Sequence, residues 1–184
     1  MTHHFLTASS LVALGALLGC DQTSSVSPST TSSSAEAQLV PWKESYQASG
    51  TIAPDARCSA SQLLTVLEGG GTATHVGKYT IVNSHCVDPA TGALTGGSFS
   101  KTAANGDQLF GTYVGSSSLI QPPAPVGIFA VTGTLTYTGG TGRFAGTTGT
   151  ARMEGSLTAD FSQQPITATS TLRMVGEISS PGQN

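Results

Sequence analysis

The stretch Thr132–Gly149, TGTLTYTGGTGRFAGTTG, decides the fold class of this chain. Around its start, apolar and threonine positions alternate. Every second residue would lie on one face of an extended chain: Phe129, Val131, Gly133, Leu135 and Tyr137. A period of two predicts a β-strand with one buried face.

Glycines reverse the chain directly after this strand. Gly139, Gly140 and Gly142 adopt positive φ at little steric cost, which a tight reversal needs. Phe144 is a large apolar residue inside the turn, so we expect it to tuck under one end of a barrel or sandwich. The adjacent Arg143 is either a solvated turn residue, which we favour, or an anion-binding group.

The rest of the domain repeats this alternation of extended segments and turns. Eight strands are expected, at residues 46–53, 62–75, 79–86, 93–103, 108–114, 126–137, 148–161 and 166–178. Asn105-Gly106 is a strong hairpin signal, and Gly69–Gly71 predicts a bulge or bend within the second strand. Eight antiparallel strands with one apolar face each close naturally into a barrel, and a two-sheet β-sandwich is the alternative.

The last two strands predict their own register. Only one alignment keeps apolar residues on one face and polar residues on the other, because a shift by one residue would mix the faces. That alignment pairs Phe161 with Ile166, Ala159 with Ala168, Leu157 with Ser170, Met153 with Met174 and Glu154 with Arg173.

The first 38 residues are expected to lie outside the barrel. The apolar run Leu11–Leu18, too short to span a bilayer, leads to Cys20, and residues 1–20 resemble a bacterial lipoprotein signal peptide with Cys20 as the lipidation site. Residues 21–38 are rich in Ser and Thr and predict a flexible tether before a domain at 39–184. We therefore expect a lipid-anchored protein of the bacterial cell envelope, attached to a membrane through its N-terminus; a secreted protein is the alternative.

Charge and motif content narrow the function classes. Seven Lys and Arg face ten Asp and Glu, without a basic run. Nucleic-acid binding is therefore disfavoured. The sequence shows no pattern typical of a metal site, a cofactor site or a catalytic set, so we assign no catalytic residue, metal or cofactor. The oligomeric state is left open.

Cys58 and Cys86 are expected to form a disulfide in an exported protein. The competing interpretation is a metal site that uses Cys86 and His85. Adjacent strand residues point to opposite faces, so these two could not easily share one ion.

The segment Thr138–Gly146, TGGTGRFAG, with the strand before it, resembles the glycine-rich segment of the allene oxide cyclase and dirigent barrels and of uncharacterised bacterial secreted proteins. The resemblance implies an eight-stranded antiparallel barrel of the calycin type, often with a cavity for a small apolar molecule. The acidic and polar residues that line the active cavities of those families have no motif-matched counterparts here. The fold is therefore carried over, and catalysis is not.

Several polar side chains are candidates for contact with a ligand: Glu68, Tyr79, His85, Tyr113, Tyr137 and Arg143. The expected inward face mixes Leu157 and Met153 with Gly155 and Ala151, and such small residues either leave a cavity or accommodate large neighbours. We favour a barrel that binds a small hydrophobic ligand. The alternatives are a structural or protein-interaction module with a filled barrel, and an isomerase or cyclase of the allene oxide cyclase type.

Overall fold

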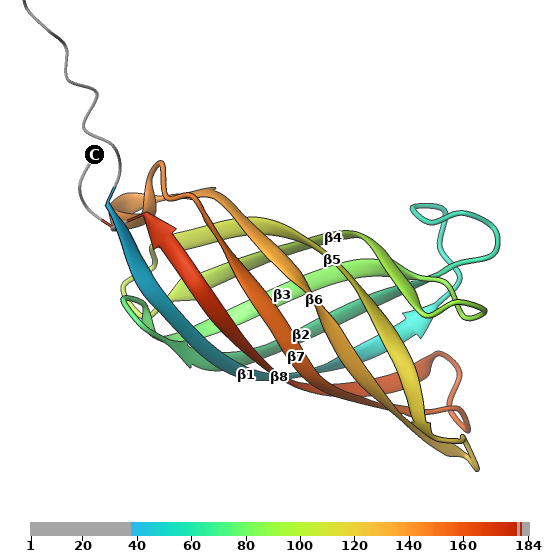
Figure 1. Cartoon of the computed structure of the whole chain (residues 1–184). Coiled ribbons are helices and arrows are strands. Elements are labelled where there is room, and N and C mark those ends of the chain that lie inside the picture. The colour runs from blue at the N-terminus through green and yellow to red at the C-terminus, as the bar shows by residue number, and fades with distance from the viewer. Residues whose placement is uncertain (1–37, 180, 182–184) are drawn as a thin grey trace, which may run out of the picture. The chain divides into compact units, whose positions relative to one another are not determined.

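The computed structural model describes residues 38–179 and 181. In that part the chain forms eight strands and one short 3-10 helix (Figure 1). The elements are β1 (Leu39–Ala53), β2 (Leu63–Ala73), β3 (Gly77–Val87), β4 (Ala93–Ala103), β5 (Gln108–Gln121), β6 (Val126–Gly140), η1 (Gly142–Phe144), β7 (Gly149–Asp160) and β8 (Ile166–Ser179).

The eight strands form one closed antiparallel barrel, in which each strand pairs with its neighbours in sequence. Closure comes from β1, which pairs with β2 on one side and with β8 on the other. The barrel predicted from the sequence is confirmed, and the alternative of a two-sheet sandwich is wrong. Because the barrel is closed, no strand has an unpaired edge to which a strand of another chain could hydrogen-bond.

The hairpin register predicted from the sequence is confirmed for the four pairs within the ladder, but the fifth is wrong: Phe161 lies in the turn, 38% exposed, and does not pair with Ile166. Met153 pairs with Met174, and Glu154 pairs with Arg173 on the outer face. On the predicted inward face of β6, Val131, Leu135 and Tyr137 are buried, with Tyr137 only 1% exposed, and Phe129 and Gly133 are half-buried. The intervening threonines face solvent. The two-residue rhythm therefore separates inside from outside in these strands.

Two strands are longer than predicted, and one predicted irregularity is wrong. β1 already begins at Leu39, which pairs with Ser179 of β8, and β5 continues to Gln121 along β6. Partner strands satisfy the backbone there although proline and serine dilute the apolar pattern. The predicted bulge at Gly69–Gly71 is absent, because β2 keeps an uninterrupted register with both neighbours.

The barrel has two different ends. The loops 54–62, 88–92, 122–125 and 161–165 lie at one end, which we call the open end. The opposite, closed end holds the start of β1, the end of β8 and η1 (Figure 1). Gly142 begins η1 with a φ of +54°, and Phe144 of η1 is completely buried. The glycine-rich turn thus covers this end with an aromatic ring.

Large inward side chains lie over glycines of the neighbouring strand. A Cβ at Gly97 of β4 would lie 2.6 Å from Cδ2 of Tyr113 on β5, and one at Gly111 of β5 would lie 2.4 Å from Cζ of Phe99 on β4. Aromatic rings that cover strand glycines are a recurrent device in curved sheets. Here the small residues accommodate large neighbours.

The predicted signal peptide 1–20, Cys20 and the tether up to residue 37 lie outside the described residues. Within the described ranges, the chain contains no helix with the length and apolar character needed to cross a membrane.

Candidate ligand-binding site

A cavity of about 470 Å³ occupies the half of the barrel next to the open end. Its interior walls are largely apolar, and its mouth is formed by loop 88–92 together with Leu119 and Phe161. An eight-stranded barrel is just wide enough to hold one small molecule, and this volume lies in the usual range for small-molecule sites.

The apolar wall of the cavity comes from β6 and β7. It consists of Phe129, Val131, Met153, Leu157 and Ala159. These positions follow the two-residue alternation of their strands, so closure of the barrel turns them inward. They offer an apolar ligand dispersion contacts and shelter from water.

The polar side chains of the cavity lining lie mainly on β2 and β3, which also contribute Leu63, Leu67 and Val87; we call this side the polar wall. Thr65 of β2 pairs with His85 of β3, and Asn83 precedes His85 by two residues on the same inward face. In a closed barrel of eight strands, β2 and β3 lie four positions from β6 and β7. The polar wall therefore faces the apolar wall across the cavity.

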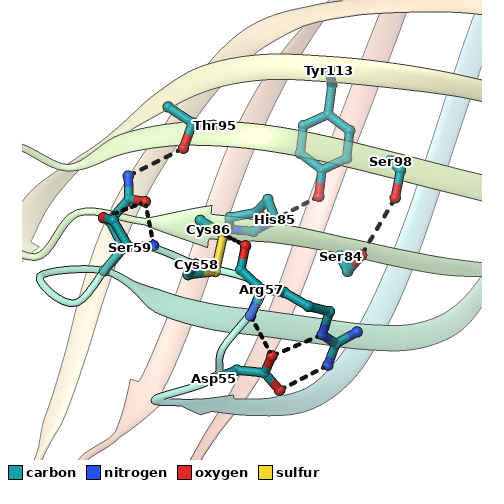
Figure 2. Close-up of a disulfide and its surroundings, with 11 residues drawn as sticks. Asp55, Arg57, Cys58, Ser59, Ser84, His85, Cys86, Thr95, Ser98 and Tyr113 are labelled. Atoms are coloured by element: carbon teal, nitrogen blue, oxygen red, sulfur yellow. Dashed lines mark hydrogen bonds and ion pairs between the residues drawn. A yellow bond between two sulfur atoms is a disulfide. The ribbon is translucent and has the colours of Figure 1, made fainter.

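Tyr113 reaches this polar wall from β5. Its ring crosses β4 at Gly97, where a side chain would collide with it. Its hydroxyl lies 2.7 Å from Nδ1 of His85 and donates a hydrogen bond of 3.3 Å to Oδ1 of Asn83 (Figure 2 shows the pair with His85). With that donation, Nδ1–H of His85 donates to the Tyr113 oxygen.

Burial keeps this cluster uncharged at neutral pH. Desolvation lowers the pKa of His85 to about 4, so its imidazole is neutral near pH 7. Burial raises the pKa of Tyr113 well above its ordinary value, so the phenol keeps its proton. The cluster therefore offers hydrogen bonds without charge.

Three polar atoms of the cavity wall have no hydrogen-bond partner in the described part of the chain: Thr65 Oγ1, Asn83 Nδ2 and Ser170 Oγ. Burial raises the pKa of the Tyr46 phenol, and the nearby Ser170 hydroxyl opposes that shift, although the two hydroxyls do not have hydrogen-bond geometry. Nearly all buried polar groups in proteins find a partner, because an unpaired one costs free energy.

The other half of the barrel is filled around a buried ion pair. Nζ of Lys101 lies 2.5 Å from Oε2 of Glu44, and both side chains are completely buried. Trp42 Nε1–H and the Tyr137 hydroxyl donate to the same carboxylate oxygen over 3.1 and 3.0 Å, and the Tyr79 hydroxyl donates to Oε1. Desolvation lowers the pKa of Lys101, and the Glu44 carboxylate opposes that shift.

The six candidate residues from the sequence do not form one site. His85 and Tyr113 lie together in the cavity, whereas Tyr79 and Tyr137 belong to the ion-pair cluster. Glu68 is exposed on the outer face of β2.

Arg143 lies at the closed end, far from the open-end loops. Its Nη2 donates to the Val76 carbonyl over 3.2 Å, and its Nε lies 3.8 Å from Oδ2 of Asp107. Its side chain is 42% exposed. These contacts are those of a partly solvated turn residue.

Sequence reasoning missed Glu44, Lys101, Thr65, Asn83 and Ser170. Their spacing in the sequence is the signal that could have found them. Glu44 lies two residues from Trp42 and from Tyr46, and Lys101 lies two residues from Phe99 and from Ala103. Residues two apart share a face of a strand, so this spacing predicts that both charged side chains point inward.

The disulfide Cys58–Cys86 joins the loop 54–62 to β3 near the cavity mouth (Figure 2). The two Cα atoms are 5.6 Å apart, a usual separation for a disulfide. Cys86 is bonded to Cys58, while the neighbouring His85 lines the cavity. Among the residues that the structure describes, no three His, Cys, Asp or Glu side chains gather closely enough to hold a metal ion.

Fold and site together define a class: a closed eight-stranded antiparallel barrel that is packed in one half and hollow in the other. Comparison of the chain with protein-family models, curated proteins and solved structures finds no match. The barrel implied by the resemblance to allene oxide cyclase and dirigent proteins is present, and no family is identified.

Proposed function

We propose that this protein is a binding barrel that holds a small hydrophobic molecule in its open half. The observation that carries the proposal is the cavity of about 470 Å³, with an apolar wall and a few inward polar groups. Ligand sites in proteins combine these features. A purely structural barrel would gain stability by filling such a space, since cavities weaken packing.

The glycine-rich turn supports a relationship to the allene oxide cyclase and dirigent-like barrels as part of this proposal. The turn lies at the closed end, with Phe144 buried beneath it. It therefore supports a shared architecture and does not touch the cavity. An isomerase of that type would use the same cavity, and turnover of a bound ligand would distinguish it from a carrier.

We also propose that the protein is exported and anchored to the bacterial envelope through lipidated Cys20. The apolar run before Cys20 and the Ser- and Thr-rich segment after it support this location. The described chain starts at the closed end, so such a tether would leave at the end opposite the cavity mouth. Mass spectrometry of protein from its native host would detect acylated Cys20, and an unmodified Cys20 would contradict the anchor.

Nile red, an uncharged apolar dye whose fluorescence rises in apolar surroundings, tests the binding function. We expect the full chain to bind it with one site. Ala159→Phe fills the cavity and should abolish binding, as should Leu157→Trp if the first variant folds poorly. Val175→Phe adds the same ring at an exposed outward position and is the control. Equal binding by wild type and both cavity variants would contradict the proposal.

A further inference from the structure

The cavity has polar atoms where a purely apolar ligand would need none. We propose that its ligand carries an uncharged hydrogen-bonding head group, such as a carbonyl, ester or hydroxyl. The head group lies against Asn83 and Thr65 on the polar wall, and the apolar body lies against β6 and β7. This inference rests on the proposed binding function and names the chemical class of the ligand.

The Asn83 amide has an unpaired donor in the cavity wall. Its Oδ1 accepts the hydrogen bond from Tyr113, which leaves Nδ2 as an unpaired donor in the cavity wall. Thr65 Oγ1, on the neighbouring strand, is unpaired as well. Asn83 and Thr65 are 4% and 1% exposed. An acceptor on a ligand would satisfy Nδ2, and either an acceptor or a donor would satisfy the hydroxyl.

The described cavity lining holds no positively charged side chain at neutral pH. Among the described residues that line the cavity there is no lysine or arginine. Lys101 is held by Glu44 in the filled half, and the imidazole of His85 is neutral near pH 7. A carboxylate that enters the cavity would therefore meet no lysine or arginine, and an imidazole that is neutral before it binds.

A buried ammonium would also lack a buried countercharge. Of the lining residues that the structure describes, only Asp88 carries a carboxylate, and it lies in the mouth loop. Burying an unpaired charge costs far more than burying a hydrogen-bonded neutral group. The site therefore selects against both charged forms of an amphiphile.

The two sides of the cavity differ in their hydrogen-bonding groups. Thr65, Asn83 and His85 lie on β2 and β3, among the apolar residues of these strands, whereas the lining side chains of β6 and β7 across the barrel are all apolar. Ser170 of β8 adds one further unpaired hydroxyl beside the cavity. A molecule with one polar end and one apolar end matches this division, whereas an alkane would leave the polar wall unpaired.

The test uses four ligands with similar chains: decane, methyl octyl ketone, decanoate and decylammonium. Each competes with Nile red on the full chain near pH 7, where both charged ligands are ionised. We expect the ketone to displace the dye and the two ions to bind at least about tenfold more weakly, as an uncompensated charge requires.

Variants then separate hydrogen bonding from simple hydrophobicity. Asn83→Leu and Thr65→Val should each weaken binding of the ketone by about fivefold to tenfold. Binding of decane should be unchanged or tighter. Thr80→Val, at an exposed outward position of β3, is the matched control and should change neither. Thr65→Val keeps the shape of the side chain, so it decides the question if Asn83→Leu does not fold.

The outcomes distinguish this inference from the proposed function. If the ketone and decane respond equally to the variants, or if decanoate or decylammonium binds as tightly as the ketone, the head-group inference is overturned and the binding function stands. If neither Nile red nor any of the four ligands binds, the binding function itself fails, and the inference fails with it.

Discussion

Lys101 and Glu44, on β4 and β1, form an ion pair of 2.5 Å between Nζ and Oε2 that is completely buried. Four aromatic rings surround the ammonium, the closest being Phe99, whose centroid lies 4.5 Å from Nζ. The pair joins strands that are distant in sequence across the filled half of the barrel.

Breaking this pair should be more harmful than removing both of its members. Lys101→Met leaves the Glu44 carboxylate buried without a cation and should lower the free energy of unfolding by about 3–5 kcal/mol. Glu44→Gln should cost a similar amount, because it leaves the ammonium unpaired. The double variant should lose less than either single variant, because it leaves no unpaired buried charge. Urea unfolding followed through the single tryptophan, Trp42, measures all three, and additive losses would contradict a coupled pair.

Acid should destabilise the barrel through His85. Burial lowers its pKa in the folded protein to about 4, below the ordinary value of 6.5. Between these two pH values, His85 is protonated in the unfolded chain and neutral in the folded protein. Stability should fall as the pH drops from about 6.5 towards 4, by up to about 3 kcal/mol from this group.

His85→Leu should remove that part of the pH dependence and flatten the profile of unfolding free energy between these pH values. Nuclear magnetic resonance of the imidazole, assigned by its loss in His85→Leu, should show a midpoint near pH 4. A midpoint at the ordinary value of 6.5 would mean that water reaches the ring freely.

Removal of the disulfide should weaken the domain. Cys58 and Cys86 are separated by 28 positions, and closing a loop of that size is worth about 3–4 kcal/mol in the chain-entropy model. Cys58→Ala with Cys86→Ala should lower the urea midpoint accordingly. Free thiols at both positions in the unreduced mature protein, detected by labelling, would contradict the bond.

Substitution of Gly97 by alanine should destabilise the protein, because Tyr113 occupies the position of the new Cβ atom. A Cβ there would lie 2.5 Å from the Tyr113 carbonyl oxygen and 2.6 Å from its ring. Gly97→Ala should cost about 1–3 kcal/mol and disturb the contact between Tyr113 and His85. Gly70→Ala, on the exposed side of β2, is the control, since its Cβ would have a single neighbour at 3.0 Å. Equal losses in the two variants would contradict the role assigned to Gly97.

Much of the fold could be predicted from the sequence because its signals are local. The alternation around Val131 and Leu135, the glycine reversal after Tyr137 and the apolar match of β7 with β8 each require only neighbouring residues. The full lengths of β1 and β5 could not be predicted, since partner strands define them. The glycines of β2 suggested a bulge, but they continue a regular strand.

The candidate site was less predictable because it depends on barrel closure. The two-residue alternation predicts that Asn83 and Lys101 point into the barrel. It does not predict which inward residues lie in the same half of the barrel. His85 and Tyr113 were found as candidates, but their contact requires Tyr113 to cross β4 over Gly97. The cavity volume depends on how such rings fill the space beside glycines, which composition alone does not determine.

The most direct test of the binding function is to locate the ligand in the barrel. Nile red is titrated into isotope-labelled full chain, and amide resonances are followed by nuclear magnetic resonance. We expect the shifts to concentrate on the cavity, at Asn83, His85 and Ala159, and to leave Phe144 at the closed end unchanged. Shifts confined to the exposed apolar residues Val114, Ile120 and Val175, or no shifts at all, would contradict the central claim.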